Sequence, residues 1–239
     1  MSKGRFIVFE GIDGSGLTTQ AELLKKWLDK QSSFPYLTKE PSDGPVGALI
    51  RLALSKRLLS PRNRINAAFQ ELSSLDSGTM ALLFAADRMD HLVTDILPKL
   101  DNGITVIADR YWLSSFAYQT VDLDLDWVRE INSKCQPPDL TIFLDVPVEM
   151  AKKRMVAQRW HVELYEDVDK LTQVRDNYQR CISKLQAEGH RIVVVEGNAP
   201  IEIVHKDVLR QVKRLFSGSQ VDANGQLGLI ENVESQTVE

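Results

Sequence analysis

A glycine-rich stretch close to the start of the chain has residue types suited to phosphate binding. Gly11, Gly16 and Thr18 satisfy the pattern G-x-x-x-x-G-K-[ST], between an apolar run and a helical pattern. Glycines let successive backbone N–H groups curl toward phosphate oxygens, and the start of a helix adds partial positive charge. We therefore expect a phosphate-binding loop, named here the glycine loop (residues 11–16), rather than a turn without a ligand.

The position of the lysine in this pattern is occupied by Leu17. A lysine there would place its ammonium group against the phosphates, and removing one such donor commonly lowers a rate by on the order of 10²–10³-fold. Leu17 is in phase with the apolar positions of its own helix, which is compatible with a packed side chain. The residues that we expect around the phosphates are Gly11, Ile12, Asp13, Gly14, Ser15, Gly16, Leu17, Thr18 and Thr19.

The elements that position this loop are indicated by alternating apolar runs and helical patterns. Short β-rich runs occur at residues 6–9, 34–38, 104–108, 140–144 and 192–195. Apolar stripes with helical spacing occur at residues 17–28 and 201–215. Because strands buried on both faces of a parallel sheet are nearly continuously apolar, the pattern predicts an α/β fold built from βαβ units.

Acidic residues occur close to the end of each predicted strand. They are Glu10, Glu40, Asp109, Asp145 and Glu196. Ligands of open α/β sheets bind at the carboxyl edge of the strands, so these acids are candidates for one site, although each alone could be a surface acid.

Separated segments of the chain resemble thymidylate kinases, which transfer a phosphoryl group from ATP to dTMP. The resemblance runs from about residue 6 to 216 and rests on Phe9-Glu10-Gly11-Ile12-Asp13-Gly14-Ser15-Gly16, Lys39-Glu40-Pro41, Leu82-Leu83-Phe84-Ala85-Ala86-Asp87-Arg88 and Asp109-Arg110-Tyr111 with Ala117-Tyr118-Gln119. It implies a P-loop NTPase-type three-layer fold, a five-stranded parallel sheet flanked by helices. ATP would bind at the glycine loop.

The resemblance also implies roles for individual residues. Those expected to bind dTMP are Asp13, Glu40, Phe84, Arg88, Arg110, Ser114, Ser115, Tyr118 and Gln119. Those expected to be catalytic are Asp109, Arg110, Arg154 and Arg159. Mg²⁺ is the expected cofactor, at Thr18 and Asp109.

A lid at about residues 154–167 is implied by the same resemblance. Many family members carry an arginine at the position of Leu164, and others carry one in the glycine loop at the position of Gly14. This chain has neither arginine, so Arg154 and Arg159 are the candidates to cover the γ-phosphate.

Composition limits the partners and the compartment. The 239 residues carry 29 Lys and Arg against 33 Asp and Glu, a net charge of −4, which is unlike the basic charge of general nucleic-acid binders. Apolar stretches fall short of the ~20 residues that span a bilayer, and the N-terminus does not resemble a signal peptide. Cys135 and Cys181 are expected to be buried thiols. We therefore expect a cytoplasmic protein without nucleic-acid or membrane partners, and the resemblance implies a homodimer.

Two regions of the chain differ in composition. Residues 1–216 are expected to form the thymidylate kinase-like domain. Residues 217–239 lack Lys and Arg and contain four acids, which indicates an acidic, flexible tail.

Three functions are compatible with the sequence. The first is ATP-dependent phosphorylation of dTMP to dTDP. The second is a catalytically weak or inactive nucleotide-binding regulator of the same fold, because the glycine loop has lost its cation. The third is a kinase for a different nucleoside monophosphate.

Overall fold

The computed structural model describes residues 3–31, 34–55, 57–58, 60–62, 71–73, 75–158 and 168–217. The strands are β1 (Phe6–Glu10), β2 (Tyr36–Lys39), β3 (Ser60–Arg62), β4 (Glu71–Ser73), β5 (Val106–Asp109), β6 (Leu140–Asp145) and β7 (Ile192–Glu196). The helical elements are α1 (Leu17–Asp29), α2 (Pro45–Leu54), α3 (Ser77–His91), η1 (Leu92–Ile96), α4 (Leu97–Asp101), α5 (Trp112–Tyr118), η2 (Gln119–Val121), α6 (Leu125–Ile131), α7 (Val148–Gln158), α8 (Val168–Ala187) and α9 (Ile201–Phe216).

The main sheet has five strands in the order β2-β5-β1-β6-β7, all pairing parallel. This confirms the predicted α/β fold, and each predicted run overlaps one of these strands. Each strand extends one residue beyond the predicted end, so that Glu10, Asp109, Asp145 and Glu196 are the last strand residues and Glu40 directly follows β2. The acids therefore share the carboxyl edge of the sheet, as expected.

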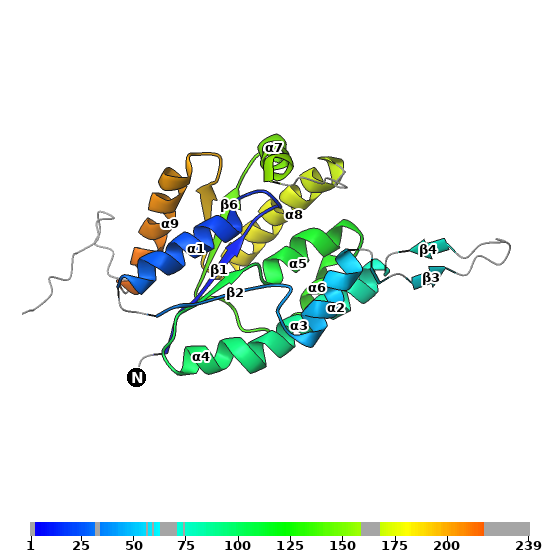
Figure 1. Ribbon diagram of the computed structural model, residues 1–239, viewed down its shortest axis with the longest axis horizontal. Coiled ribbons are helices and arrows are strands. Elements are labelled where there is room, and N and C mark those ends of the chain that lie inside the picture. The colour runs from blue at the N-terminus through cyan, green and yellow to red at the C-terminus, as the bar shows by residue number, and fades with distance from the viewer. Residues whose placement is uncertain are drawn as a thin grey trace, which may run out of the picture.

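Side chains of each central strand alternate between two cores. Phe6 and Val8 of β1 contact the core covered by α5 and α8, whereas Ile7 and Phe9 contact the core covered by α1 and α9. Helices consequently lie on both faces of the sheet, and Figure 1 shows α1 and α9 on one side and α5 and α8 on the other. The period of two in an extended strand produces these three layers.

Leu17 is the first residue of α1 and packs into the second of these cores. Its side chain is 6% exposed and joins Phe9, Ala21 and Leu24. This confirms that the apolar residue in the lysine position packs rather than points at the loop. Phe34, by contrast, lies outside β2, because it is 77% exposed with a φ of 41° and β2 begins only at Tyr36.

Several elements were not identified from the sequence. β3 and β4 form a separate antiparallel pair that projects from the body in Figure 1.

Cys135 and Cys181 are free and buried, as predicted. Across the described residues, we find no helix of the length and apolarity that crossing a membrane requires.

Candidate active site

The glycine loop connects β1 to α1 and depends on glycine at two positions. Gly14 and Gly16 have φ angles of 80° and 97°, which side chains disfavour. A Cβ on Gly14 would lie 2.4 Å from the backbone oxygen of Ala151 in α7. Within the loop, Ser15 Oγ is buried without a hydrogen-bond partner. The loop therefore combines a close approach to α7 with an unused hydroxyl, in the place where a phosphate site was predicted.

Thr18 and Asp109 are brought together from the start of α1 and the end of β5. Thr18 Oγ1 donates a hydrogen bond of 2.6 Å to Asp109 Oδ2. Burial raises the pKa of Asp109, against the opposing effects of this hydrogen bond and of Arg110. A hydroxyl and a carboxylate are oxygen donors of the kind that Mg²⁺ prefers, so this pair fits the cation expected here.

Arg110 reaches from the end of β5 back to the glycine loop. Its guanidinium donates to the Gly11 carbonyl at 3.0 Å and to Asp13 Oδ1 at 2.6 Å, and it lies over the ring of Tyr118. Arg110 has a φ of 73°, a conformation that costs a non-glycine residue about 1–2 kcal/mol. Such strain at a charged residue beside a loop is typical of a functional position.

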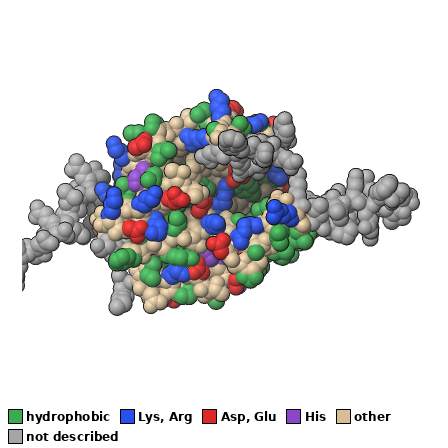
Figure 2. Space-filling view, in the orientation of Figure 1, with side chains coloured by type: hydrophobic (Ala, Val, Ile, Leu, Met, Phe, Trp, Pro, Cys, Tyr) green, Lys and Arg blue, Asp and Glu red, His purple; other side chains and the backbone are tan. Residues whose placement is uncertain are grey.

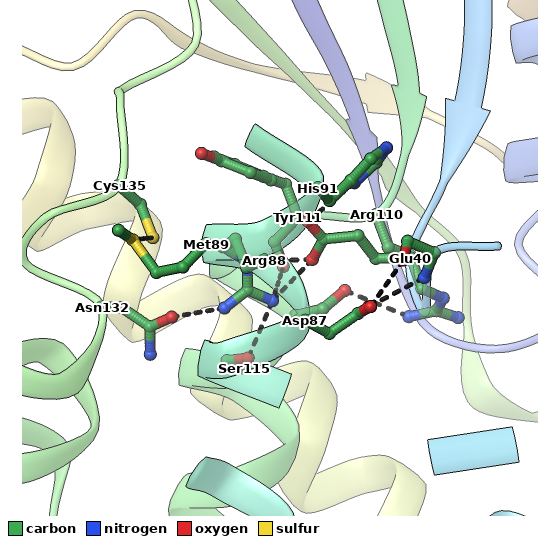
Figure 3. A network of polar contacts seen from close by, with 12 residues as sticks. Glu40, Asp87, Arg88, Met89, His91, Arg110, Tyr111, Ser115, Asn132 and Cys135 are labelled. Carbon is green, nitrogen blue, oxygen red and sulfur yellow. Dashed lines mark hydrogen bonds and ion pairs between the residues drawn. The ribbon is translucent and has the colours of Figure 1, made fainter. Parts of the chain in front are cut away.

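Arg88 lies at the centre of a second, buried cluster, which Figure 3 shows from close by. Its Nε donates to Glu40 Oε2 at 2.9 Å, and Arg88 and Glu40 side chains are 1% and 3% exposed. The guanidinium also bonds the Asn132 side chain, the Tyr111 carbonyl and Ser115 Oγ. Arg88 is therefore held between β2, α5 and the residue after α6.

Three further residues predicted for dTMP, Phe84, Tyr118 and Gln119, lie on α3, α5 and η2. Phe84 is half-buried one helical turn before Arg88 on α3. Gln119 Nε2 donates to Ser115 Oγ at 3.2 Å, whereas Gln119 Oε1 is buried without a hydrogen-bond partner. Tyr118 Oη accepts from the Asp13 amide at 3.1 Å, which connects this side to the glycine loop.

Ser114 is directed away from this cluster. Its hydroxyl donates to Glu10 Oε2 at 2.6 Å and also contacts Tyr178 Oη at 2.8 Å. Glu10 is fully buried, and this burial raises its pKa from 4.5 to about 7, against the hydrogen bond from Ser114 and the charge of Arg110. The Ser114 hydroxyl therefore has internal partners in this structure, and its contact with dTMP stays a prediction.

Arg154 of α7 contacts the glycine loop at a different residue from Arg110. Its guanidinium donates to the Gly197 carbonyl at 3.0 Å and to the Ser15 carbonyl at 3.4 Å. It therefore bridges the glycine loop and the turn after β7. Arg159, most of the lid at about 154–167 and nearly all of the tail at 217–239 lie outside the described residues.

Some residues of these clusters were not predicted from the sequence. Asn132 and Tyr178 lie in segments where no motif pointed to them, and Glu10 was noted only as an acid at a strand end. Tyr178 donates to Glu10 at 3.1 Å across 168 positions, a contact that only the fold creates.

Comparison with known proteins relates the site to a family. The family model described as thymidylate kinase matches residues 9–208. A "Probable thymidylate kinase" of Pyrococcus abyssi is 40% identical over 217 residues, which is 90% of this chain and 99% of that protein. A protein of the same name from Methanocaldococcus jannaschii is 36% identical over 218 residues, again 90% of this chain and 99% of the relative.

Proposed function

The chain belongs to the thymidylate kinase family, and we propose that it transfers the γ-phosphoryl group of ATP to dTMP, giving ADP and dTDP. One observation carries the proposal most directly. Arg110 follows the strand that ends in Asp109 and its guanidinium contacts both Gly11 and Asp13 of the glycine loop. These contacts support the proposal, because a cation beside the loop could bond both a donor phosphate on the loop and an acceptor phosphate next to it.

The chemistry needs positioning and charge neutralisation more than covalent participation. Backbone N–H groups of the glycine loop and the start of α1 would bind the phosphates of ATP. Arg110 would contact the transferring phosphoryl group, because a guanidinium can bond two phosphate oxygens at once. Asp13, which now pairs with Arg110, would exchange part of that contact for substrate.

Mg²⁺ would be held by the Thr18 hydroxyl and the Asp109 carboxylate. When bound, it would neutralise phosphate charge. Among the described residues there is no cluster of three or more His, Cys, Asp and Glu side chains suited to a metal. We therefore propose that nucleotide oxygens and water complete its coordination.

The pocket for dTMP is proposed around Arg88. Phe84 would stack on the thymine ring, and the unpartnered Gln119 Oε1 would accept a hydrogen bond from the base. Glu40 and Ser115 hold the Arg88 guanidinium in place for a base oxygen. Tyr118 would close the pocket beside the sugar, next to Asp13.

Arg154 is proposed to supply the cation that position 17 lacks. Leu17 is uncharged, and its side chain packs into the core instead of facing the loop. Arg154 already donates to the Ser15 carbonyl within the loop and to Gly197 on its other side. We propose that this guanidinium turns to the phosphates of ATP when they bind, with Arg159 as the second candidate.

The test is release of ADP by the full chain with ATP, Mg²⁺ and dTMP, beside an Asp109→Ala control. We expect turnover that requires dTMP, is abolished or greatly reduced in the control, and exceeds turnover with dUMP, dCMP or dGMP. Binding of dTMP by calorimetry without turnover would contradict the proposal and favour the regulator. Faster turnover of another monophosphate would favour the third function.

A homodimer is proposed to form through α2 and α3, which pack side by side (Figure 1). Large apolar side chains are exposed along these helices and the following η1. They are Leu49, Leu52, Leu82, Met89 and Val93, with exposed fractions between 36% and 60%. We propose that a second copy covers them in the cytoplasm. Sedimentation of Leu82→Glu should give a monomer where the parent chain gives a dimer; a parent monomer would contradict this.

On the described part of the face in Figure 2, acidic and basic side chains are intermixed. The continuous basic field that a nucleic-acid partner favours is not seen on that part of this face.

A further inference from the structure

Glu10 is a fully buried carboxylate between the sheet and the glycine loop. It is the last residue of β1, and its backbone leads directly into Gly11. Oε1 accepts from the amides of Tyr111 at 3.0 Å and Ser114 at 3.2 Å. Oε2 accepts from Ser114 Oγ at 2.6 Å and Tyr178 Oη at 3.1 Å. Four donors from two different helical regions therefore converge on one side chain.

Of the two amides that bond Oε1, that of Tyr111 directly follows Arg110 and that of Ser114 lies in the first turn of α5. Arg110 has the left-handed φ of 73°, and its own amide donates to the Phe9 carbonyl at 2.9 Å. The next amide, of Tyr111, has Glu10 as its acceptor. The backbone carbonyl of Phe9 thus accepts from the amide of Arg110, and the side chain of Glu10 accepts from the next amide, that of Tyr111.

This conformation aims the guanidinium at the glycine loop. With its backbone in the left-handed region, Arg110 turns back toward β1 and contacts Gly11 and Asp13. Without Glu10, the buried Tyr111 amide would lose its acceptor, which is costly for a buried donor, and a left-handed φ at Arg110 would no longer be favoured by this hydrogen bond.

We propose that Glu10 is a positioning residue, which holds Arg110 in its left-handed conformation and thereby aligns Arg110 with the glycine loop for phosphoryl transfer. The inference rests on the proposed function. It requires no contact between Glu10 and either nucleotide, since Glu10 is 0% exposed behind the turn. Small displacements of an aligned catalytic group can cost about 10²-fold in rate.

The test compares Glu10→Ala with Glu10→Gln in dTMP-dependent ADP release at pH 8.5. Alanine removes the acceptor, and we expect kcat to fall about 10²-fold while KM for ATP changes less than about threefold. Glutamine keeps an amide oxygen for Tyr111 and Ser114 and offers its NH₂ group to the Ser114 and Tyr178 hydroxyl oxygens. We expect its kcat to stay within about tenfold of the parent.

A double-mutant cycle with Arg110→Ala identifies the route of the effect. If Glu10 acts through Arg110, Glu10→Ala changes kcat less than about threefold in the Arg110→Ala background. An equal further loss in that background would overturn the proposal, as would parental kcat in Glu10→Ala. The parent chain in the same assay tests the proposed function separately, because its turnover does not depend on this outcome.

A matched control comes from the other end of β1. Asp139 Oδ2 accepts from the Phe6 amide at 2.7 Å, so it too is a carboxylate that anchors backbone, but it lies at the edge of the sheet opposite the glycine loop. Asp139→Ala should lower thermal stability while leaving kcat unchanged. A merely structural role for Glu10 would predict that the two alanine variants behave alike, with full kcat below their unfolding temperatures.

Discussion

The two halves of the site are built in different ways. Around Arg88, the proposed acceptor half is a closed network in which a buried cation is already paired with Glu40. Around the glycine loop, the proposed donor half relies on backbone N–H groups, and among the described residues the partners of Arg154 are the carbonyl oxygens of Ser15 and Gly197. The Arg88 guanidinium is thus already paired, whereas that of Arg154 contacts no carboxylate among the described residues. The proposed roles therefore divide recognition of the acceptor and neutralisation of the donor phosphates between different residues.

The variant with the largest expected loss of stability disrupts the acceptor half. Arg88→Met leaves Glu40 buried without its cation, and breaking a buried ion pair in this way destabilises a protein by about 3–5 kcal/mol. Urea unfolding followed by circular dichroism measures the loss. Adding Glu40→Gln should recover part of it, because the remaining buried group is then neutral. A loss below about 1 kcal/mol would show that this half is less organised than its hydrogen bonds indicate.

A second variant breaks the donor half. Arg154→Ala should lower kcat about 10²–10³-fold, the range for removing one preorganised donor, with little change in unfolding free energy. Lys153→Ala is the matched control, because Lys153 is an exposed cation one position earlier on α7. If Arg154→Ala keeps the parental kcat, as we expect of Lys153→Ala, the proposal that Arg154 supplies the missing cation is wrong.

Glu10, at the junction of the halves, should make stability depend on pH. Its pKa is about 7 in the folded chain against 4.5 for the exposed group, so the folded state keeps the proton to higher pH. The contribution of protonated Glu10 to the free energy of unfolding is fully present below pH 4.5. It is lost as pH rises through 7, by on the order of 3 kcal/mol. Glu10→Gln should flatten this part of the profile in chemical unfolding from pH 4.5 to 8. An unchanged slope would mean that other groups produce it.

The smallest expected change in kcat comes from restoring a lysine in the donor half. Leu17→Lys in the parent chain should change kcat by less than about tenfold, because Arg154 already supplies charge. In the Arg154→Ala background the same change should restore most of the lost rate. A large gain in the parent chain would instead show that the loop lacks a cation. Thermal unfolding must accompany the assay, since Leu17 is packed in the core.

Local patterns predicted the fold and the loop but only part of the site. The period of apolar residues identified the strands of the main sheet, because each buried strand carries its own signal along the chain. The glycine loop was likewise found from adjacent residues, whereas the Asp109–Arg110 pair was proposed from the resemblance to thymidylate kinases. Asn132 and Tyr178 were missed because they act through contacts far apart in sequence. The hydrogen bond from Ser114 to Glu10 was missed for the same reason, and the predicted contact of Ser114 with substrate stays a prediction.

Gly14 also limits how this protein could be re-engineered. A methyl group there would lie 2.4 Å from the Ala151 carbonyl, within a helix that the loop touches directly. An arginine-bearing loop taken from another kinase would therefore not fit by exchange of residues 11–16 alone, because the backbone of α7 occupies the space. A functional chimera would have to exchange α7 together with the loop, so that the residue at position 14 and the backbone of α7 remain compatible.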